Sequence, residues 1–146
     1  MEKLSLSLTL IPDKRKVRKD NLPNAKVRLK NEGTQVIIVN GRMLLMPAGS
    51  PSRVKEMVFS ISGPPGSISL KAVTVKAGVA GREHFVRLLP GEFIDKVYEL
   101  KEYFYYDQPG NYTIEAIYYN ETEYEIPGNK SWKGELVSNK EHFEII

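Results

Sequence analysis

Residues 109–119 read PGNYTIEAIYY, a tight turn followed by a strand that alternates apolar and polar side chains. Proline next to glycine is typical of turns, because proline presets one backbone angle and glycine accepts conformations that other residues avoid. Beyond the turn, apolar or aromatic side chains recur at every second position: Tyr112, Ile114, Ala116 and Tyr118. A period of two predicts a strand with one buried face.

Two segments near the N-terminus alternate in the same way. Leucines alternate with hydroxyl residues in 4–10, and apolar residues alternate with basic ones in 25–30, so each segment predicts a strand with one wet face. Residues 35–39, QVIIV, lack polar alternation, which is typical of a strand covered on both faces. The pair Asn40-Gly41 follows, and it favours a hairpin, with a single bulged strand as the alternative.

Turns divide the middle of the chain into further short strands. Residues 47–51 and 63–66 are rich in proline and glycine and predict loops. The strands expected here are 57–61, 67–75, 85–88 and 93–100. In the last of them we expect Ile94, Val97 and Leu100 to be buried. Residues 101–106 are expected to form a single helical turn.

The C-terminal segment, 135–146, predicts a closing strand with a bulge near Ser138-Asn139, preceded by Trp132 as the anchor of the last hairpin. Many short strands without an amphipathic helix indicate a sandwich or a barrel. A chain of 146 residues is long enough to bury its own core. We therefore expect one all-β domain over residues 1–146, an antiparallel β-sandwich of about seven to nine strands with little helix.

From residue 89 onward the chain resembles the last strands of immunoglobulin-like domains in uncharacterised bacterial and archaeal proteins and beside some secreted peptidases. The matching residues are LPGE at 89–92, Tyr98, Tyr103-Phe104, PGNYTI at 109–114, Tyr118 and WKGELVSN at 132–139. The resemblance implies an immunoglobulin-like sandwich with a tyrosine corner, in which the Tyr112 hydroxyl returns to the backbone a few residues upstream. Ile114 stands where antibody domains carry a cysteine, so only the sandwich geometry is implied, and it says little about function.

The sequence carries no recognisable catalytic motif. The absence of cysteine excludes disulfides, thiolate nucleophiles and cysteine-bound metals. The only histidines, His84 and His142, belong to no triad or zinc-protease pattern, and we interpret both as structural. Glycine loops that cradle phosphates are missing as well. We expect no enzyme activity, no cofactor and no metal site.

The charge is distributed unevenly along the chain. Residues 1–60 hold 12 basic and 5 acidic side chains, whereas residues 61–146 hold 9 and 13, and we expect the two sets to pair across strands. The densest basic stretch contains Lys14, Arg15, Lys16, Arg18 and Lys19. We favour a stretch that covers a strand edge, and the alternative is a polyanion site. Nucleic acid is not expected, because no aromatic residues interleave.

Tyrosines concentrate in the late strands. Adjacent Tyr118 and Tyr119 must face opposite sides of a strand, so some of these rings are exposed. Tyr106, Tyr119 and Tyr124 are the candidates for a platform that binds protein or sugar, although closure of the core is the favoured interpretation.

These patterns favour a non-catalytic module that binds another protein through an aromatic sheet face or the loops at one end, with a homodimer through a sheet edge as an option. The alternative is a carbohydrate- or polyanion-binding accessory domain. No apolar run approaches the 20 or so residues of a membrane helix, so we expect a soluble protein. The N-terminus lacks signal-peptide features, so the compartment is cytoplasmic as written, or extracytoplasmic if a signal was removed.

Overall fold

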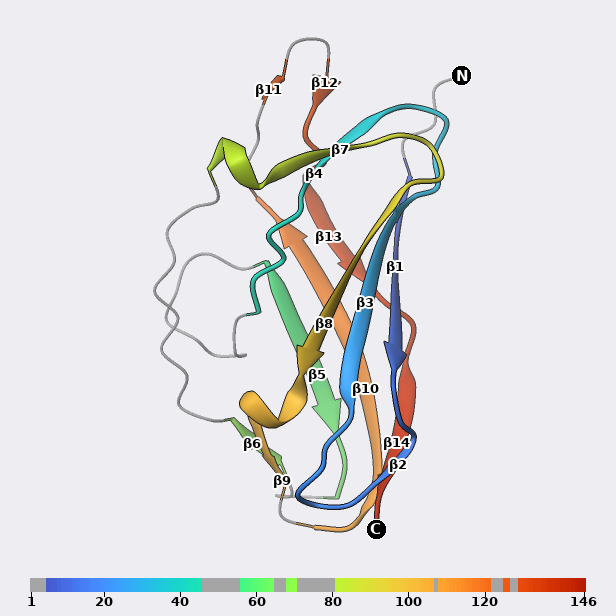
Figure 1. The fold of residues 1–146 in the computed structure, drawn as a ribbon, viewed down its shortest axis with the longest axis vertical. Helices are drawn as coiled ribbons and strands as arrows, with labels where there is room; N and C mark the ends of the chain where they lie inside the picture. Colours follow the sequence, from blue (N-terminus) through green and yellow to red (C-terminus); the bar gives the residue numbers. More distant parts are fainter. Residues whose placement is uncertain are drawn as a thin grey trace.

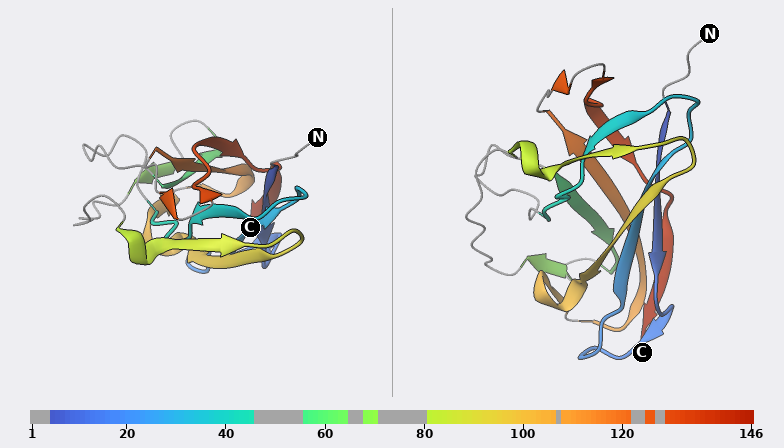
Figure 2. Two further views of the ribbon diagram at one scale, coloured as in Figure 1. Left: turned by 90° about the horizontal axis from the view of Figure 1, so that it is seen from above. Right: turned by 45° about the horizontal axis from the view of Figure 1, so that its top comes forward.

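The computed structural model describes residues 5–45, 56–64, 68–70, 81–106, 108–121, 125–126 and 129–146. These residues form an all-β fold in which a three-stranded and a five-stranded sheet pack as two layers around one core (Figure 1; Figure 2 adds the view from above). Helix is limited to two single 3₁₀ turns, η1 (Arg82–His84) and η2 (Leu100–Glu102), in the described ranges. None of the helical segments described is long and apolar enough to cross a membrane. The predicted all-β class is confirmed.

The first sheet has the antiparallel order β1 (Leu6–Pro12), β3 (Asn24–Asn31) and β8 (Phe93–Glu99). Its alternation buries the leucines of β1 and the apolar residues of β3, as the sequence predicts. The expectation that Val97 is buried is wrong, because Tyr98 points inward and Val97 is 57% exposed. Ile94, Val97 and Leu100 are three residues apart, and a strand repeats every two.

The second sheet is built around its longest strand, β10 (Gly110–Asn120). β5 (Met57–Ser62) pairs with one edge, and β13 (Gly134–Val137) and β14 (Glu141–Ile145) share the other. β2 (Lys16–Val17) then adds to β14 in parallel. Between β13 and β14 the Ser138 hydroxyl accepts the Ala116 N–H at 2.8 Å, and the Ser138 N–H donates to the Ala116 carbonyl. The predicted bulge is confirmed.

Aromatic rings close one end of the core. Tyr112 stacks on Phe143 with ring centroids 5.4 Å apart, and Tyr106 packs edge-on against Tyr112 at 5.3 Å. The Tyr112 hydroxyl donates to the Gln108 carbonyl at 2.5 Å, which confirms the predicted return to the backbone. At the other end of β10, Trp132 packs on the ring of Tyr118 at 5.8 Å, so it anchors the chain ahead of β13.

Three short strand pairs lie outside the two main sheets. They are β4 (Ile37–Asn40) with β7 (Phe85–Leu88), β6 (Ile68–Leu70) with β9 (Phe104–Tyr106), and β11 (Glu125–Ile126) with β12 (Asn129–Lys130). β4 is buried throughout, as its apolar run predicts. Nine strands of the described chain have four residues or more, which agrees with the seven to nine expected. The helical turn expected at 101–106 is shorter than predicted: η2 ends at Glu102, and β9 follows from Phe104.

The hairpin predicted at Asn40-Gly41 is wrong. β4 pairs with β7, and the chain runs on through 41–45 until Leu45 forms a parallel bridge with Met57. The Asn40 side chain accepts the N–H of Arg42 at 3.0 Å, and the backbone of Met43 has a φ of 47°, so the segment bends across the fold without turning back. The loop predicted at 47–51 lies outside the described residues.

The two edges of the first sheet differ. At the β1 edge, the Asn139 side chain accepts the Leu10 N–H at 2.8 Å and donates to the Leu10 carbonyl at 3.1 Å, as a neighbouring strand would. At the β8 edge, no strand of the described chain pairs on the side away from β3. Among the described residues, one edge is therefore covered and the other is unpaired.

Candidate functional site

The outer face of the first sheet presents side chains from three paired strands. The registers align them in three rows, each running from β1 through β3 to β8: Ile11, Lys26 and Val97; Thr9, Arg28 and Asp95; Ser7, Lys30 and Phe93. We refer to these nine side chains as the outer face. Three of them are cationic and one is anionic; Arg28 is paired with Asp95, and Lys30 lies 3.7 Å from the Glu32 carboxylate, so the face carries a small excess of positive charge.

Arg28 lies at the centre of the outer face. Its guanidinium donates to both carboxylate oxygens of Asp95, at 2.7 and 2.9 Å, and lies 3.8 Å from the ring centroid of Phe93. The hydrogen bonds from Arg28 lower the pKa of Asp95, and the same bonds raise the pKa of Arg28. The pair is thus held flat across two strands while a third of each side chain stays exposed.

Apolar side chains occupy the margins of the outer face. Val97 is 57% exposed, Phe93 47% and Ile11 39%. Because side chains in a strand alternate, these residues cannot reach the core without a shift in register. The outer face therefore exposes apolar surface beside cationic groups.

A groove of about 290 Å³ runs along the open edge of β8. Leu44 and Leu45 form one wall, the β8 residues from Lys96 to Glu99 form the other, and Tyr103 lies at one end. The groove gives an approaching chain access to the β8 backbone.

A larger cleft, about 510 Å³, opens at the end of the sandwich that carries η2. Its lining consists of Lys19, Asp20, Leu22, Lys101, Glu102, Phe104, Tyr105 and Tyr106. Two of the predicted site residues, Lys19 and Tyr106, meet here. Tyr106 is buried, and its hydroxyl has no hydrogen-bond partner among the described residues, whereas Tyr105 faces solvent.

The predicted basic stretch covers a strand edge, as favoured. Lys16 belongs to β2, which forms the edge beside β14, and its ammonium lies 3.9 Å from the Glu144 carboxylate. Arg15 donates to Glu141 at 2.8 Å. Lys14, Arg18 and Lys19 are exposed and form no ion pair within the described part of the chain. The predicted pairing of early basic with late acidic residues is confirmed for Arg15 and Lys16.

Two of the three candidate tyrosines, Tyr106 and Tyr119, are described, and they do not share a surface. Tyr106 packs on Tyr112 near the start of β10, while Tyr119 lies near its end. Tyr119 is partly exposed, and burial followed by the charge of Glu135 raises its pKa. Tyr124 lies outside the described residues.

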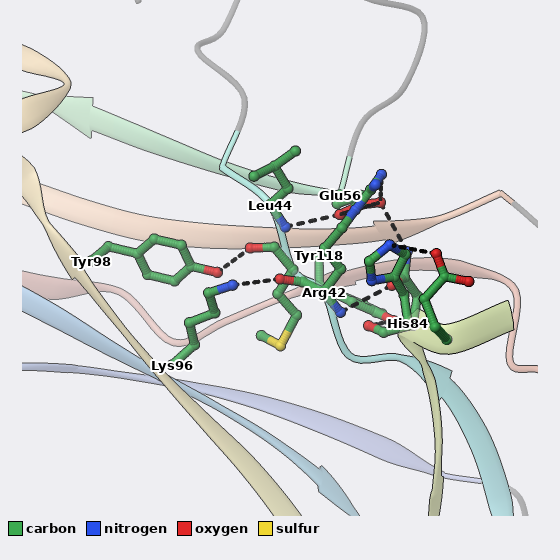
Figure 3. Close-up of polar contacts among 10 residues, drawn as sticks. Arg42, Leu44, Glu56, His84, Lys96, Tyr98 and Tyr118 are labelled. Atoms are coloured by element: carbon green, nitrogen blue, oxygen red, sulfur yellow. Dashed lines mark hydrogen bonds and ion pairs between the residues drawn. The ribbon is translucent and has the colours of Figure 1, made fainter. Parts of the chain in front are cut away.

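The most connected polar cluster lies inside the fold, around Glu56 (Figure 3). The Glu56 side chain is 2% exposed and accepts hydrogen bonds from the Arg42 guanidinium at 2.5 and 2.9 Å, from the Asn40 amide at 3.0 Å and from the Leu44 N–H at 2.9 Å. Burial by itself would raise the pKa of Glu56, but these donors, Arg42 foremost, bring it below its ordinary value. Both carboxylate oxygens are therefore occupied.

Neighbouring strands hold the same segment through its carbonyls (Figure 3). Lys96 donates to the Arg42 carbonyl at 2.6 Å, the Tyr98 hydroxyl donates to the Met43 carbonyl, and the Tyr118 hydroxyl donates to the Asn40 carbonyl at 2.9 Å. These bonds satisfy backbone groups that an irregular buried segment would otherwise leave unpaired. We therefore assign the cluster to structure, since no acceptor of Glu56 is left for a substrate.

Sequence reasoning missed this cluster. Glu56 and Arg42 are separated by 14 positions and meet only because the segment 41–45 crosses to β5. One signal was present: a lone carboxylate directly ahead of the apolar strand that starts at Met57.

Neither histidine is in a catalytic arrangement in the described structure. The His142 ring lies 3.1 Å from the Thr113 hydroxyl, and the His84 ring lies 3.4 Å from the exposed carboxylate of Glu83. Among the described residues, no three acidic or histidine side chains gather as metal ligands would.

Comparison with known proteins gave no relative: no protein-family model matches the chain, and no curated protein is significantly similar to it.

Proposed function

We propose that the chain is a non-catalytic binding module of the immunoglobulin-like class that engages another protein through the outer face. The class is supported by the hydrogen bond from Tyr112 to Gln108 and by the two packed sheets. Fold analogy carries no function, so the surface has to supply the argument.

The observation that carries the proposal is the exposure of Val97, Phe93 and Ile11 around one arginine on one flat sheet face. Aromatic and arginine side chains are enriched in interfaces and dominate binding energy there. Single exposed apolar residues are normal on a protein surface. Here, however, Phe93 and Val97 lie on either side of Asp95, which holds Arg28 in place. The basic character of the face favours an acidic partner, and attraction of that kind weakens with salt.

The test is affinity capture from cells of the source organism, with the wild-type chain and two variants as bait. In the outer-face variant, Phe93→Ser with Val97→Thr, the captured partner should fall at least tenfold. In the matched control, Val137→Thr, an exposed valine of the second sheet is changed, and capture should be unaffected. A partner that the outer-face variant retains in full contradicts the proposal.

A second function, binding of a carbohydrate or polyanion, is supported by the cleft beside η2. The cleft combines the solvent-facing ring of Tyr105 with the exposed side chain of Lys19, and an aromatic ring with a polar rim suits a sugar or an acidic sugar. A glycan array and heparin retention at low salt test it, with Tyr105→Ala and Lys19→Glu expected to abolish any binding seen. Absence of binding by the wild-type chain in both assays rejects this function.

A further inference from the structure

The backbone of β8 has hydrogen-bonding groups that no described strand uses. The Asn31 N–H donates to the Glu92 carbonyl at 3.0 Å, so these residues form a hydrogen-bonded pair of the β3–β8 ladder. Such pairs alternate along an antiparallel ladder, so Ile94, Lys96 and Tyr98 bond to β3. Hence the N–H and carbonyl groups of the odd-numbered residues, 93–99, point away from β3, and those of Val97 and Glu99 lie in the part of β8 that lines the groove.

The same alternation explains the other edge. The Glu32 N–H donates to the Ser5 carbonyl at 2.8 Å, so the odd residues of β1 bond to β3 and its even residues point outward. Leu10 is one of these even residues, and Asn139 satisfies both of its backbone groups. The agreement between the two edges supports the assignment of the free groups on β8.

The β8 edge carries three charged residues, Asp95, Lys96 and Glu99, but its backbone is regular. Its seven residues contain no proline and no glycine. Its only lysine, Lys96, is turned inward, where its ammonium bonds to the Arg42 carbonyl. Every residue of the strand therefore has an N–H available for the ladder, and the inward charge of Lys96, which would discourage pairing if it were free, is engaged within its own copy.

We propose that the occupant of this edge is β8 of a second copy, added antiparallel about a two-fold axis with Lys96 opposite Lys96. The inference goes beyond the proposed function, because the second copy binds the β8 edge while the outer faces of the two copies lie side by side. Directly opposite residues must point to the same side of the sheet, so only registers that keep odd residues opposite odd residues fit.

The two-fold axis could pass through Asp95, Lys96 or Val97, and the charges of β8 distinguish these three registers. Asp95 opposite Asp95 brings like charges together, and Val97 opposite Val97 brings Asp95 opposite Glu99. With Lys96 at the centre, Asp95 lies opposite Val97 and Phe93 opposite Glu99, so no carboxylate meets another. The two Lys96 ammonium groups are each held by an Arg42 carbonyl of their own copy.

This register also covers the exposed apolar side chains of β8. Diagonal neighbours across an antiparallel pair are within reach of long and aromatic side chains. Val97 of each copy would lie diagonal to Phe93 and Val97 of the other, which makes one apolar strip across the two-fold axis. The two outer faces then join as a continuous six-stranded surface, since each contributes three strands.

The experiment uses the purified chain alone, so its result is independent of the capture experiment. Light scattering over a concentration series should approach twice the chain mass of 16.6 kDa. In parallel, amide exchange at low and high concentration should show new protection at Phe93, Asp95, Val97 and Glu99 only. A monomer at every concentration overturns the inference, and so does a dimer in which these four amides exchange as in the monomer.

A variant completes the test. Val97→Pro removes an N–H that the β3 ladder does not use, so the fold is kept while edge pairing is lost, and dimerisation should weaken at least tenfold. Val137→Thr, the matched control, should dimerise like the wild type. If Val97→Pro dimerises unchanged, the inference is wrong; if it fails to fold, the amide exchange of the wild type still decides.

Discussion

Two arginine–carboxylate pairs of this protein have the same chemistry and opposite surroundings. Arg42 and Glu56 meet inside the fold, where two further donors fill the carboxylate, while Arg28 and Asp95 meet on the outer face with a third of each side chain exposed. The inner pair is saturated and fixes a backbone segment. The outer pair keeps free surface that a partner can approach. The difference teaches that surroundings, rather than residue type, separate a structural ion pair from one available for recognition.

The largest expected effect comes from breaking the inner pair. Glu56→Gln leaves the Arg42 guanidinium without its carboxylate, and removing one partner of a buried pair costs about 3 to 5 kcal/mol of unfolding free energy. Urea denaturation followed by circular dichroism measures it. Asp95→Asn is the matched change on the outer face and should cost far less, because water replaces the lost partner. Equal losses at both positions would contradict the distinction between the pairs.

The pair of Arg42 and Glu56 should also make the free energy of unfolding depend on pH. The pKa of folded Glu56 is lowered, so the unfolded chain takes up its proton first as the pH falls below about 4.3. The stabilisation from Glu56 is therefore complete above that pH and is lost as the pH falls toward the lowered value. Urea midpoints from about pH 6 down to pH 3 should fall less steeply for Glu56→Gln than for the wild type. Parallel curves would show that other carboxylates dominate.

Tyr112 and Tyr106 pack on each other, but only the Tyr112 hydroxyl has a hydrogen-bond partner among the described residues. Tyr112→Phe removes the bond to Gln108 and should cost about 0.5 to 1.5 kcal/mol. Tyr106→Phe removes a buried hydroxyl that has no partner among the described residues, so stability should be unchanged or higher. Thermal melts of the two variants give the comparison directly. A large loss for Tyr106→Phe would reveal a partner of that hydroxyl.

The smallest effect is expected on the outer face. Val97→Thr keeps the β-branched shape that suits a strand and removes exposed apolar surface, so the unfolding free energy should change by no more than about 0.5 kcal/mol. Denaturation at low protein concentration, where the chain is monomeric, is the appropriate measurement. A cost near that of Glu56→Gln would mean that the outer face is a structural surface.

Much of the fold could be predicted where local pattern and burial agree. The alternation in β1, β3 and β10 and the apolar run of β4 are patterns within single strands. The Tyr112 bond and the bulge at Ser138 follow from nearby turn signals, so they too are local. The hairpin predicted at Asn40-Gly41 failed for the opposite reason: Glu56, 16 positions along the chain, accepts a hydrogen bond from the Asn40 amide, and the segment bends toward β5 without forming a hairpin. Long-range bonds override the preference of a dipeptide.

The candidate surface was largely hidden from the sequence. Lys26, Arg28 and Lys30 could be read as a wet strand face, but which strand lies beside them depends on the pairing of β3 with β8, more than sixty positions away. Val97 was expected in the core, so the apolar part of the outer face was assigned to the inside. Tyr106 was named as a candidate for an exposed platform, with closure of the core as the favoured interpretation; it is buried, and its neighbour Tyr105 faces solvent.

The amide of Asn139 has a consequence for assembly. Chains with two open sheet edges can add to one another without limit, and a non-closing contact of that kind produces fibres. In the first sheet a side chain occupies the β1 edge at Leu10, so addition through the proposed β8 contact would stop within that sheet once two β8 edges have met. Asn139 would thus help to limit this sheet to a closed pair. Asn139→Ala would leave both backbone groups of Leu10 without that partner.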